Sequence, residues 1–113
     1  MIIFFQTRKL ERAANSESHG IRLWGEHRAA KIRQRLVELA AANTLADIST
    51  LPPPRCHQLT GKLDEQFAVD ISPNERLIFE VANEPTPRRP DGGIDLEQVT
   101  AILVLRIEDY HGR

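Results

Sequence analysis

The sequence predicts an α+β fold in which an antiparallel β-sheet carries two N-terminal helices on one face, in the order β-α-α-β-β-β-β. Apolar residues in the first half recur with the helical spacing of three to four, and those in the second half alternate with a period of two. Pro52-Pro53-Pro54 forces extended backbone between the two halves. A length of 113 residues fits a single domain over residues 1–113.

The N-terminal half is expected to begin with a strand and a helix. Residues 2–5 form a short apolar run that is typical of a strand. Residues 6–18 are polar and rich in Arg, Glu and Ala, which predicts a helix with a thin apolar stripe. We expect His19-Gly20 to end this helix, because glycine readily adopts the left-handed backbone of a C-terminal cap.

The second helix, predicted over residues 26–42, has the clearest pattern. Its apolar residues follow the spacing i, i+4, i+7, i+8 and form one face: Ile32, Leu36, Leu39 and Ala40. The opposite face is predicted to be charged, and it holds Arg28, Lys31, Arg35 and Glu38. This basic face is either a phosphate-binding surface or an ordinary solvated helix face.

The second half reads as an antiparallel meander. Four further strands are predicted over residues 56–60, 66–71, 76–81 and 101–107, with turns at 61–64 and 72–75. The last strand is apolar on both faces, as expected for a central strand. Residues 82–95 contain three Pro and two Gly, which predicts a long mobile loop.

Composition is that of an ordinary globular protein, with 41% hydrophobic and 27% charged residues. No run of about 18 apolar residues occurs, so the sequence predicts no membrane span. The single Cys56 has no partner for an internal disulfide, which fits a reducing cytoplasm.

The net charge of −1 hides an asymmetry. Residues 1–62 carry ten Lys and Arg against five Asp and Glu, whereas residues 63–113 carry five against eleven. A compact domain with this distribution is expected to have one basic and one acidic face. The basic face is the candidate for contact with phosphate groups.

Four features carry chemistry: His57, Lys62, Arg76 and the C-terminal Asp109-Tyr110-His111. Each has an ordinary reading, as a packed core histidine, a turn lysine, a surface arginine and a solvated tail. Together they supply the parts of a metal-free ribonuclease. Imidazoles exchange protons near neutral pH, arginine and lysine stabilise phosphate charge, and tyrosine stacks on an unpaired base.

Three stretches resemble the HigB group of the RelE/ParE toxin superfamily: residues 55–62, residues 74–80 and residues 107–111. The most specific parts are Arg-x-His-x-Leu-x-Gly, which begins at Arg55, and the terminal Asp-Tyr-His. The resemblance covers nearly the whole chain and implies a RelE-like fold. It also implies a toxin of a type II toxin–antitoxin module that cleaves mRNA on the ribosome by 2′-hydroxyl attack, without metal or another cofactor.

Carried over by matching position, the catalytic residues implied are His57, Arg76, Asp109, Tyr110 and His111. RNA or phosphate contacts are expected from Lys62, Arg55, Arg28, Lys31 and Arg35. The implied partners are mRNA, the ribosome and a cognate HigA-like antitoxin of the helix-turn-helix type. A homodimer or a toxin–antitoxin hetero-oligomer is expected, with no membrane association.

Alternatives remain open from sequence alone. Three acidic residues depart from the family pattern and predict a lowered affinity for RNA: Asp64, Glu65 and Glu75. The Glu75 carboxylate could pair with Arg76. A weak or degenerate copy would act by protein binding, either on an antitoxin or, like ParE, on a gyrase-type target. A metal site from Cys56, His57 and His111 would have three ligands without a spaced fourth.

Overall fold

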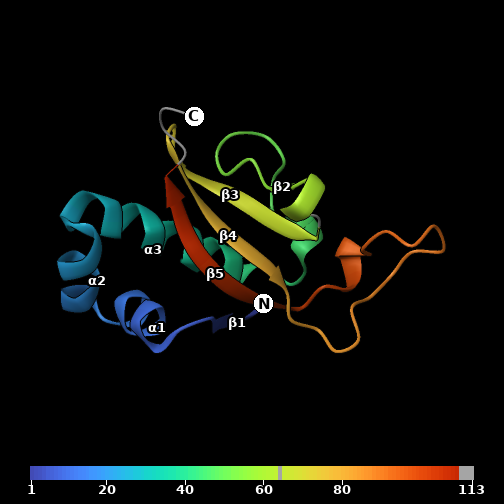
Figure 1. Ribbon diagram of the computed structural model, residues 1–113, viewed down its shortest axis with the longest axis horizontal. Helices are drawn as coiled ribbons and strands as arrows, with labels where there is room; N and C mark the ends of the chain where they lie inside the picture. The colour runs from blue at the N-terminus through green and yellow to red at the C-terminus, as the bar shows by residue number, and fades with distance from the viewer. Residues whose placement is uncertain (64, 110–113) are drawn as a thin grey trace.

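The computed structural model describes residues 1–63 and 65–109 and confirms the α+β fold (Figure 1). The strands are β1 (Ile2–Phe5), β2 (His57–Gln58), β3 (Gln66–Ser72), β4 (Glu75–Val81) and β5 (Ala101–Asp109). The helices are α1 (Arg8–Asn15), α2 (Glu17–Trp24) and α3 (Glu26–Ala41). Short 3-10 turns are η1 (Leu45–Asp47), η2 (Gly61–Leu63) and η3 (Leu96–Gln98). Among the described residues, no helix is long and apolar enough to cross a membrane.

The five strands form one sheet in the order β1-β5-β4-β3-β2. Neighbouring strands are antiparallel except β1 and β5, which are parallel, so the sheet is mixed rather than purely antiparallel. A parallel pair needs a long crossover, and here the helices and the meander supply it. The predicted central strand is confirmed, since β5 lies between β1 and β4.

The main core lies between the sheet and α3, which runs behind the strands in Figure 1. Ile32 and Leu39 of α3 pack there against the buried side chains of Phe67, Leu77 and Phe79. The predicted inward alternation of β3 and β4 is therefore confirmed. A smaller apolar cluster on the other face, Leu59, Ala68 and Ile78, holds the β2–η2 segment against the sheet.

The first predicted helix is in fact two helices, and the prediction that His19-Gly20 ends it is wrong. Ser16 separates α1 from α2 and caps α2, because its hydroxyl accepts a hydrogen bond from the His19 amide. Gly20 lies inside α2, where a Cβ would come 2.7 Å from the Ala13 carbonyl oxygen. It allows α1 and α2 to approach closely. The helix ends instead at Gly25, whose φ is +81°.

Arg35 was predicted to lie on the charged outer face of α3. This prediction is wrong, because the residue is only 6% exposed. Its Nε donates to the Asp70 carbonyl oxygen at 2.6 Å, and its Nη1 pairs with Glu38 at 3.2 Å. That carbonyl lies where the register between β3 and β4 shifts. The guanidinium thus satisfies a backbone acceptor beside the core, which helical periodicity alone does not reveal.

Residues 82–95, predicted as a mobile loop, form a hydrogen-bonded arm. Arg88 and Ile94 form an isolated antiparallel bridge, and Ile94 is buried in the main core. At the base, the Asn83 side-chain oxygen accepts hydrogen bonds from the amides of Thr100 and Ala101, both at 3.1 Å. An ion pair between Arg88 and Glu65 links the middle of the arm to the residue before β3, in addition to the hydrogen bonds at its base.

Candidate functional site

Two rows of side chains cross the face of the sheet that points away from α3. Ala68 and Asp70 of β3 lie on this face, because the residues alternating with them line the main core. Strand register places Arg76 beside Asp70, and Glu108 beside Arg76. The second row runs across all four antiparallel strands and comprises His57, Ala68, Ile78 and Arg106. We call this surface the sheet face.

A β-bulge in β5 directs two charged residues onto the sheet face. The register with β4 shifts between Ile78, opposite Arg106, and Phe79, opposite Val104. Leu105 is the extra residue, and it packs against the small cluster on the sheet face. If Leu105 were instead paired with β4 and β5 had no bulge, strict alternation from Val104 would turn Arg106 and Glu108 toward the core.

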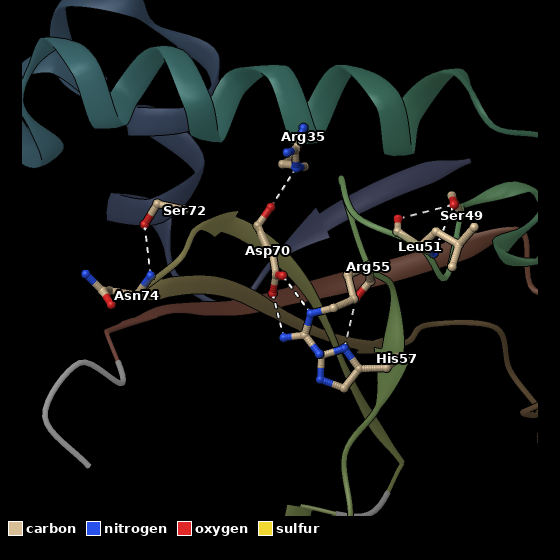
Figure 2. A network of polar contacts seen from close by, with 8 residues as sticks. All are labelled: Arg35, Ser49, Leu51, Arg55, His57, Asp70, Ser72 and Asn74. Carbon is tan, nitrogen blue, oxygen red and sulfur yellow. Dashed lines mark hydrogen bonds and ion pairs between the residues drawn. The ribbon is translucent and has the colours of Figure 1, made fainter.

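His57 is half-buried, and its orientation is fixed by backbone. Its Nδ1 lies 2.9 Å from the Arg55 carbonyl oxygen (Figure 2). A carbonyl only accepts, so Nδ1 must carry the proton in this contact. In the neutral imidazole, Nε2 is then the ring nitrogen without a proton.

The Arg55–His57 segment is held on β3 through Asp70. Arg55 donates through Nε and Nη2 to the two Asp70 carboxylate oxygens at 2.7 and 2.9 Å. Figure 2 shows Arg35 and Arg55 approaching Asp70 from opposite sides, one on its carbonyl and one on its carboxylate. The backbone reinforces this anchor, since the Asp70 amide donates to the Pro54 carbonyl at 2.7 Å. The segment that carries His57 is therefore held against β3 by both side-chain and backbone contacts to Asp70.

Arg76 pairs with Glu108, not with its sequence neighbour Glu75. The Arg76 Nε lies 3.3 Å from the Glu108 carboxylate, and Arg106 approaches the same oxygen at 3.9 Å. The expectation that Glu75 could pair with Arg76 is wrong, because successive residues of a strand point to opposite faces. The sheet face thus holds cations that are already matched by carboxylates.

Glu75, only 8% exposed, faces α3 and binds Arg28. Two Arg28 nitrogens contact its carboxylate, with Nε at 2.9 Å from Oε2 and Nη2 at 2.5 Å. The hydrogen bond to Glu75 raises the pKa of Arg28, and the nearby Asp109 adds to this rise. Asp109 stands opposite Glu75 in the strand register and lines the same small cavity as Arg28.

The structure brings some sequence-predicted residues together and separates others. His57, Arg55 and Arg76 share the sheet face; their strand positions place the Cα atoms of His57 and Arg76 about 12 Å apart. Arg28 and Asp109 lie on the helix side, and Arg35 is buried. Lys62 on η2 and Lys31 on α3 are exposed. Tyr110 and His111 lie outside the described residues.

Sequence reasoning missed Asp70, Arg106 and Glu108. Asp70 looked like an ordinary outward residue of a strand, and the other two followed a run assigned to a buried strand. One signal was present in the sequence. In Leu105-Arg106-Ile107-Glu108, the charges recur with a period of two, which indicates that this end of the strand has one polar face.

Cys56 belongs to the main core and is not presented to the sheet face. Burial raises the pKa of its thiol to about 11, which opposes thiolate chemistry near neutral pH. Within the described ranges, no three His, Cys, Asp or Glu side chains gather as a metal site would require.

Comparisons with known proteins give a structural likeness only. No protein-family model matches the chain, and no curated protein is similar to it in sequence. Among solved structures, it is similar to a YoeB/ParE toxin from Agrobacterium tumefaciens, with a TM-score of 0.60, 9% identity and coverage of 98% of this chain and 100% of that one.

Two structures from Staphylococcus aureus are also similar: YoeB in the YoeB–YefM complex, with a TM-score of 0.57, and the YoeB dimer, with 0.55. Both are 14% identical, and each alignment covers 98% of this chain and 97% of that one. At such identities the likeness establishes the fold. The chain therefore has the fold of YoeB/ParE-type toxins over nearly its whole length.

Proposed function

We propose that this chain is the toxin of a type II toxin–antitoxin module and an endoribonuclease that cuts mRNA on the ribosome. The observation that carries the proposal is the sheet face, where His57 of β2 and Arg76 of β4 lie on the same side of β3, in a fold of the YoeB/ParE type. Three sequence stretches that resemble HigB toxins support the same reading. Asp109 ends the described part of β5, and the expected catalytic Tyr110 and His111 follow it in sequence.

The proposed reaction needs only groups of the chain. The 2′-oxygen attacks the adjacent phosphorus, so that a P–O2′ bond forms while the P–O5′ bond breaks. One imidazole takes the 2′-hydroxyl proton and another group protonates the leaving 5′-oxygen, giving a 2′,3′-cyclic phosphate and a 5′-hydroxyl end. His57 Nε2 is one of these proton-transfer atoms, and Arg76 stabilises the charge on phosphorus oxygens.

The other residues that were expected to contact RNA are proposed to have different roles. Lys62 is exposed on η2, beside the segment that carries His57, and is proposed to contact phosphate. Lys31 is exposed on α3, away from the sheet face, so a contact there would serve the ribosome rather than the cleaved bond. Arg55, Arg28 and Arg35 are bound within the protein and are proposed to position the site rather than to grip RNA.

A cognate antitoxin of the HigA-like, helix-turn-helix type is the proposed partner in the cytoplasm. The structural neighbour from S. aureus was solved in complex with YefM, and another as a dimer, which supports a toxin–antitoxin hetero-oligomer or a homodimer for this chain. The second candidate function is protein binding without efficient cleavage. It is favoured by the ion pairs Arg55–Asp70 and Arg76–Glu108, which neutralise cations that would otherwise attract RNA.

Expression in a bacterial host separates these two functions. The ribonuclease reading predicts that the chain arrests growth and cuts ribosome-bound mRNA, and that removal of residues 109–113 abolishes both while the domain stays folded. The protein-binding reading predicts growth arrest without new mRNA ends. A full chain that neither slows growth nor cuts message would contradict the proposed enzyme.

A further inference from the structure

A groove runs between β1, at the edge of the sheet, and the helices α1 and α3. Its volume is about 350 Å³, and much of its wall is apolar, with Ile3 and Phe5 from the strand and Leu36 and Val37 from α3. It lies at the opposite edge of the sheet from β2, which carries His57. The groove is therefore separate from the proposed catalytic surface.

The backbone of β1 is open along this groove. In the described part of the chain, β1 has a strand neighbour on one side only, β5. The amides of Ile2 and Gln6 point to that neighbour, donating to the carbonyls of Thr100 and Val104 at 2.9 Å. In a parallel pair such groups alternate, so the amide and carbonyl groups of Ile3 and Phe5 point to the outer edge. Such an edge can pair with another strand.

Arg33 brings an unsatisfied donor into the groove. Its Nη1 is buried and has no acceptor within the described residues. Its Nη2 lies 3.6 Å from the carboxylate of Glu17, which is itself well exposed. A buried guanidinium nitrogen without an acceptor is unfavourable. Since the Arg33 side chain as a whole is 32% exposed, a carboxylate from outside the domain can reach the guanidinium and, after a small rotation of the side chain, satisfy this donor.

Apolar side chains are exposed on both sides of the same edge. Val37 of α3 is 66% exposed, and Ile2 and Phe4 on the sheet-face side are 61% and 52% exposed. A strand added to β1 would send alternate side chains to these two surfaces. The open backbone of β1, the apolar side chains beside it and the unsatisfied Arg33 donor all fit one kind of ligand, an extended peptide segment that carries a carboxylate.

We propose that an extended segment of a partner protein adds to the edge of β1 as a sixth strand and places an Asp or Glu side chain on Arg33. The Met1 amino group, bonded to the Ala40 carbonyl at 2.9 Å, marks one end of the groove. Arg33 lies seven residues earlier in α3, about 10 Å along the helix axis, which about three extended residues span. The segment therefore needs apolar residues followed or preceded, about three positions away, by a carboxylate.

A second copy of this chain fits less well. Edge-to-edge pairing would offer β1 and its flanking residues 1–7, which contain no Asp or Glu. Such a dimer would pair the backbone but leave Arg33 without its carboxylate. The inference also goes beyond the proposed cleavage reaction and does not depend on it, since β1 and Arg33 take no part in that chemistry.

A displayed library of random ten-residue peptides, selected on the full chain, tests the inference. We expect selected peptides to alternate apolar residues with an Asp or Glu, and to lose at least tenfold in affinity on Arg33→Met. Arg22→Met, the same change at an exposed site on α2 outside the groove, should leave binding unchanged. Because Arg33→Met removes an unsatisfied buried donor, its melting temperature should stay equal or rise, so lost binding would not report unfolding.

Amide hydrogen exchange with a selected peptide gives the second readout. Bound peptide should slow exchange at Ile3 and Phe5, whose amides face the outer edge, and change little at Ile2, already bonded to β5. The inference is overturned if no peptide is selected, if the Arg33→Met variant binds equally well, or if Ile3 and Phe5 stay unprotected. Sedimentation showing a dimer that Arg33→Met leaves intact and that blocks peptide binding would instead assign the edge to a second copy.

Discussion

His57 owes its orientation to a backbone carbonyl rather than to another side chain. Because the Arg55 carbonyl accepts from Nδ1, and Asp70 fixes the Arg55 side chain, the ring orientation is set by the protein itself. Such preorganisation matters for proton transfer, which requires the exchanging nitrogen to lie within hydrogen-bond reach of the reacting oxygen. The effect of His57 on cleavage is therefore separable from its effect on folding.

His57→Asn should lower the rate of mRNA cleavage by at least about 100-fold, since asparagine keeps a donor for the Arg55 carbonyl but has no proton to exchange near neutral pH. The melting temperature should change little. Cleavage kinetics on programmed ribosomes and thermal unfolding measure the two effects. His27→Asn, at an exposed histidine of α3, is the matched control; equal activity of both variants would remove His57 from the mechanism.

Cys56 should be unreactive in the folded protein. Burial raises the pKa of its thiol to about 11, so roughly 0.1% is thiolate at pH 8, whereas an exposed cysteine is about one-quarter ionised there. Alkylation by iodoacetamide at pH 8 should be at least about 100-fold slower in native protein than in guanidinium chloride. Rapid native alkylation would show that the segment before β2 opens readily.

At the level of elements, the sequence predicted most of the strands and the face on which the helices pack. The alternation in β3 and β4 was sufficient to predict both strands and their core-facing side, because hydrophobic residues mark one face of each strand. It failed for the N-terminal helices, where Ser16 stops one helix and caps the next within a continuous polar segment. It also failed for Arg35, whose burial depends on a carbonyl 35 residues away.

The bulge in β5 could not be predicted, because an extra residue is visible only against the partner strand. Leu105 changes which residues meet β4, and through it Arg106 and Glu108 reach the sheet face. Candidate site residues such as Arg76 and His57 were therefore found from sequence motifs, whereas their immediate charged neighbours needed the strand register. Tertiary pairing, not local propensity, decides that part of the site.

Deletion of Leu105 should leave the fold intact. Arg106 would then follow Val104 directly and keep its place opposite Ile78, so that Ile107 still faces the core and Glu108 still lies opposite Arg76. The cost should be that of losing one partly buried leucine side chain, about 1–2 kcal/mol, as for Leu105→Ala. Thermal unfolding followed by circular dichroism compares the two variants; loss of the cooperative transition in the deletion variant alone would show that the bulge itself is needed for folding.

For the whole molecule, ion pairs between the two halves of the chain neutralise part of the charge asymmetry of the sequence. Cations of the first half pair with carboxylates of the second half, as in Arg28–Glu75 and Arg55–Asp70. These pairs tie the helix layer and the β2 segment to the sheet. They also lower the positive potential around these arginines, and we therefore still predict a weak affinity for RNA, now from paired arginines and not from a Glu75–Arg76 pair.

Glu108→Gln should strengthen RNA binding, because it removes a carboxylate beside Arg76 and Arg106 while keeping a side chain of similar size. We expect about a two- to tenfold lower Kd at low salt and a salt dependence steeper by up to about 0.7 in log–log slope. Fluorescence anisotropy with a single-stranded RNA measures both. Glu84→Gln makes the same charge change at an exposed residue of the arm; an equal gain there would mean that only net charge matters.

The proposed cleavage of mRNA by 2′-hydroxyl attack leaves cut ends of a defined chemistry, and these ends can be measured. Purified chain is added to ribosomes programmed with a defined message, and the new ends are analysed. We expect 2′,3′-cyclic phosphate and 5′-hydroxyl ends whose formation requires both the ribosome and His57. An uncut message, or 3′-hydroxyl and 5′-phosphate ends produced by attack of water, would contradict it.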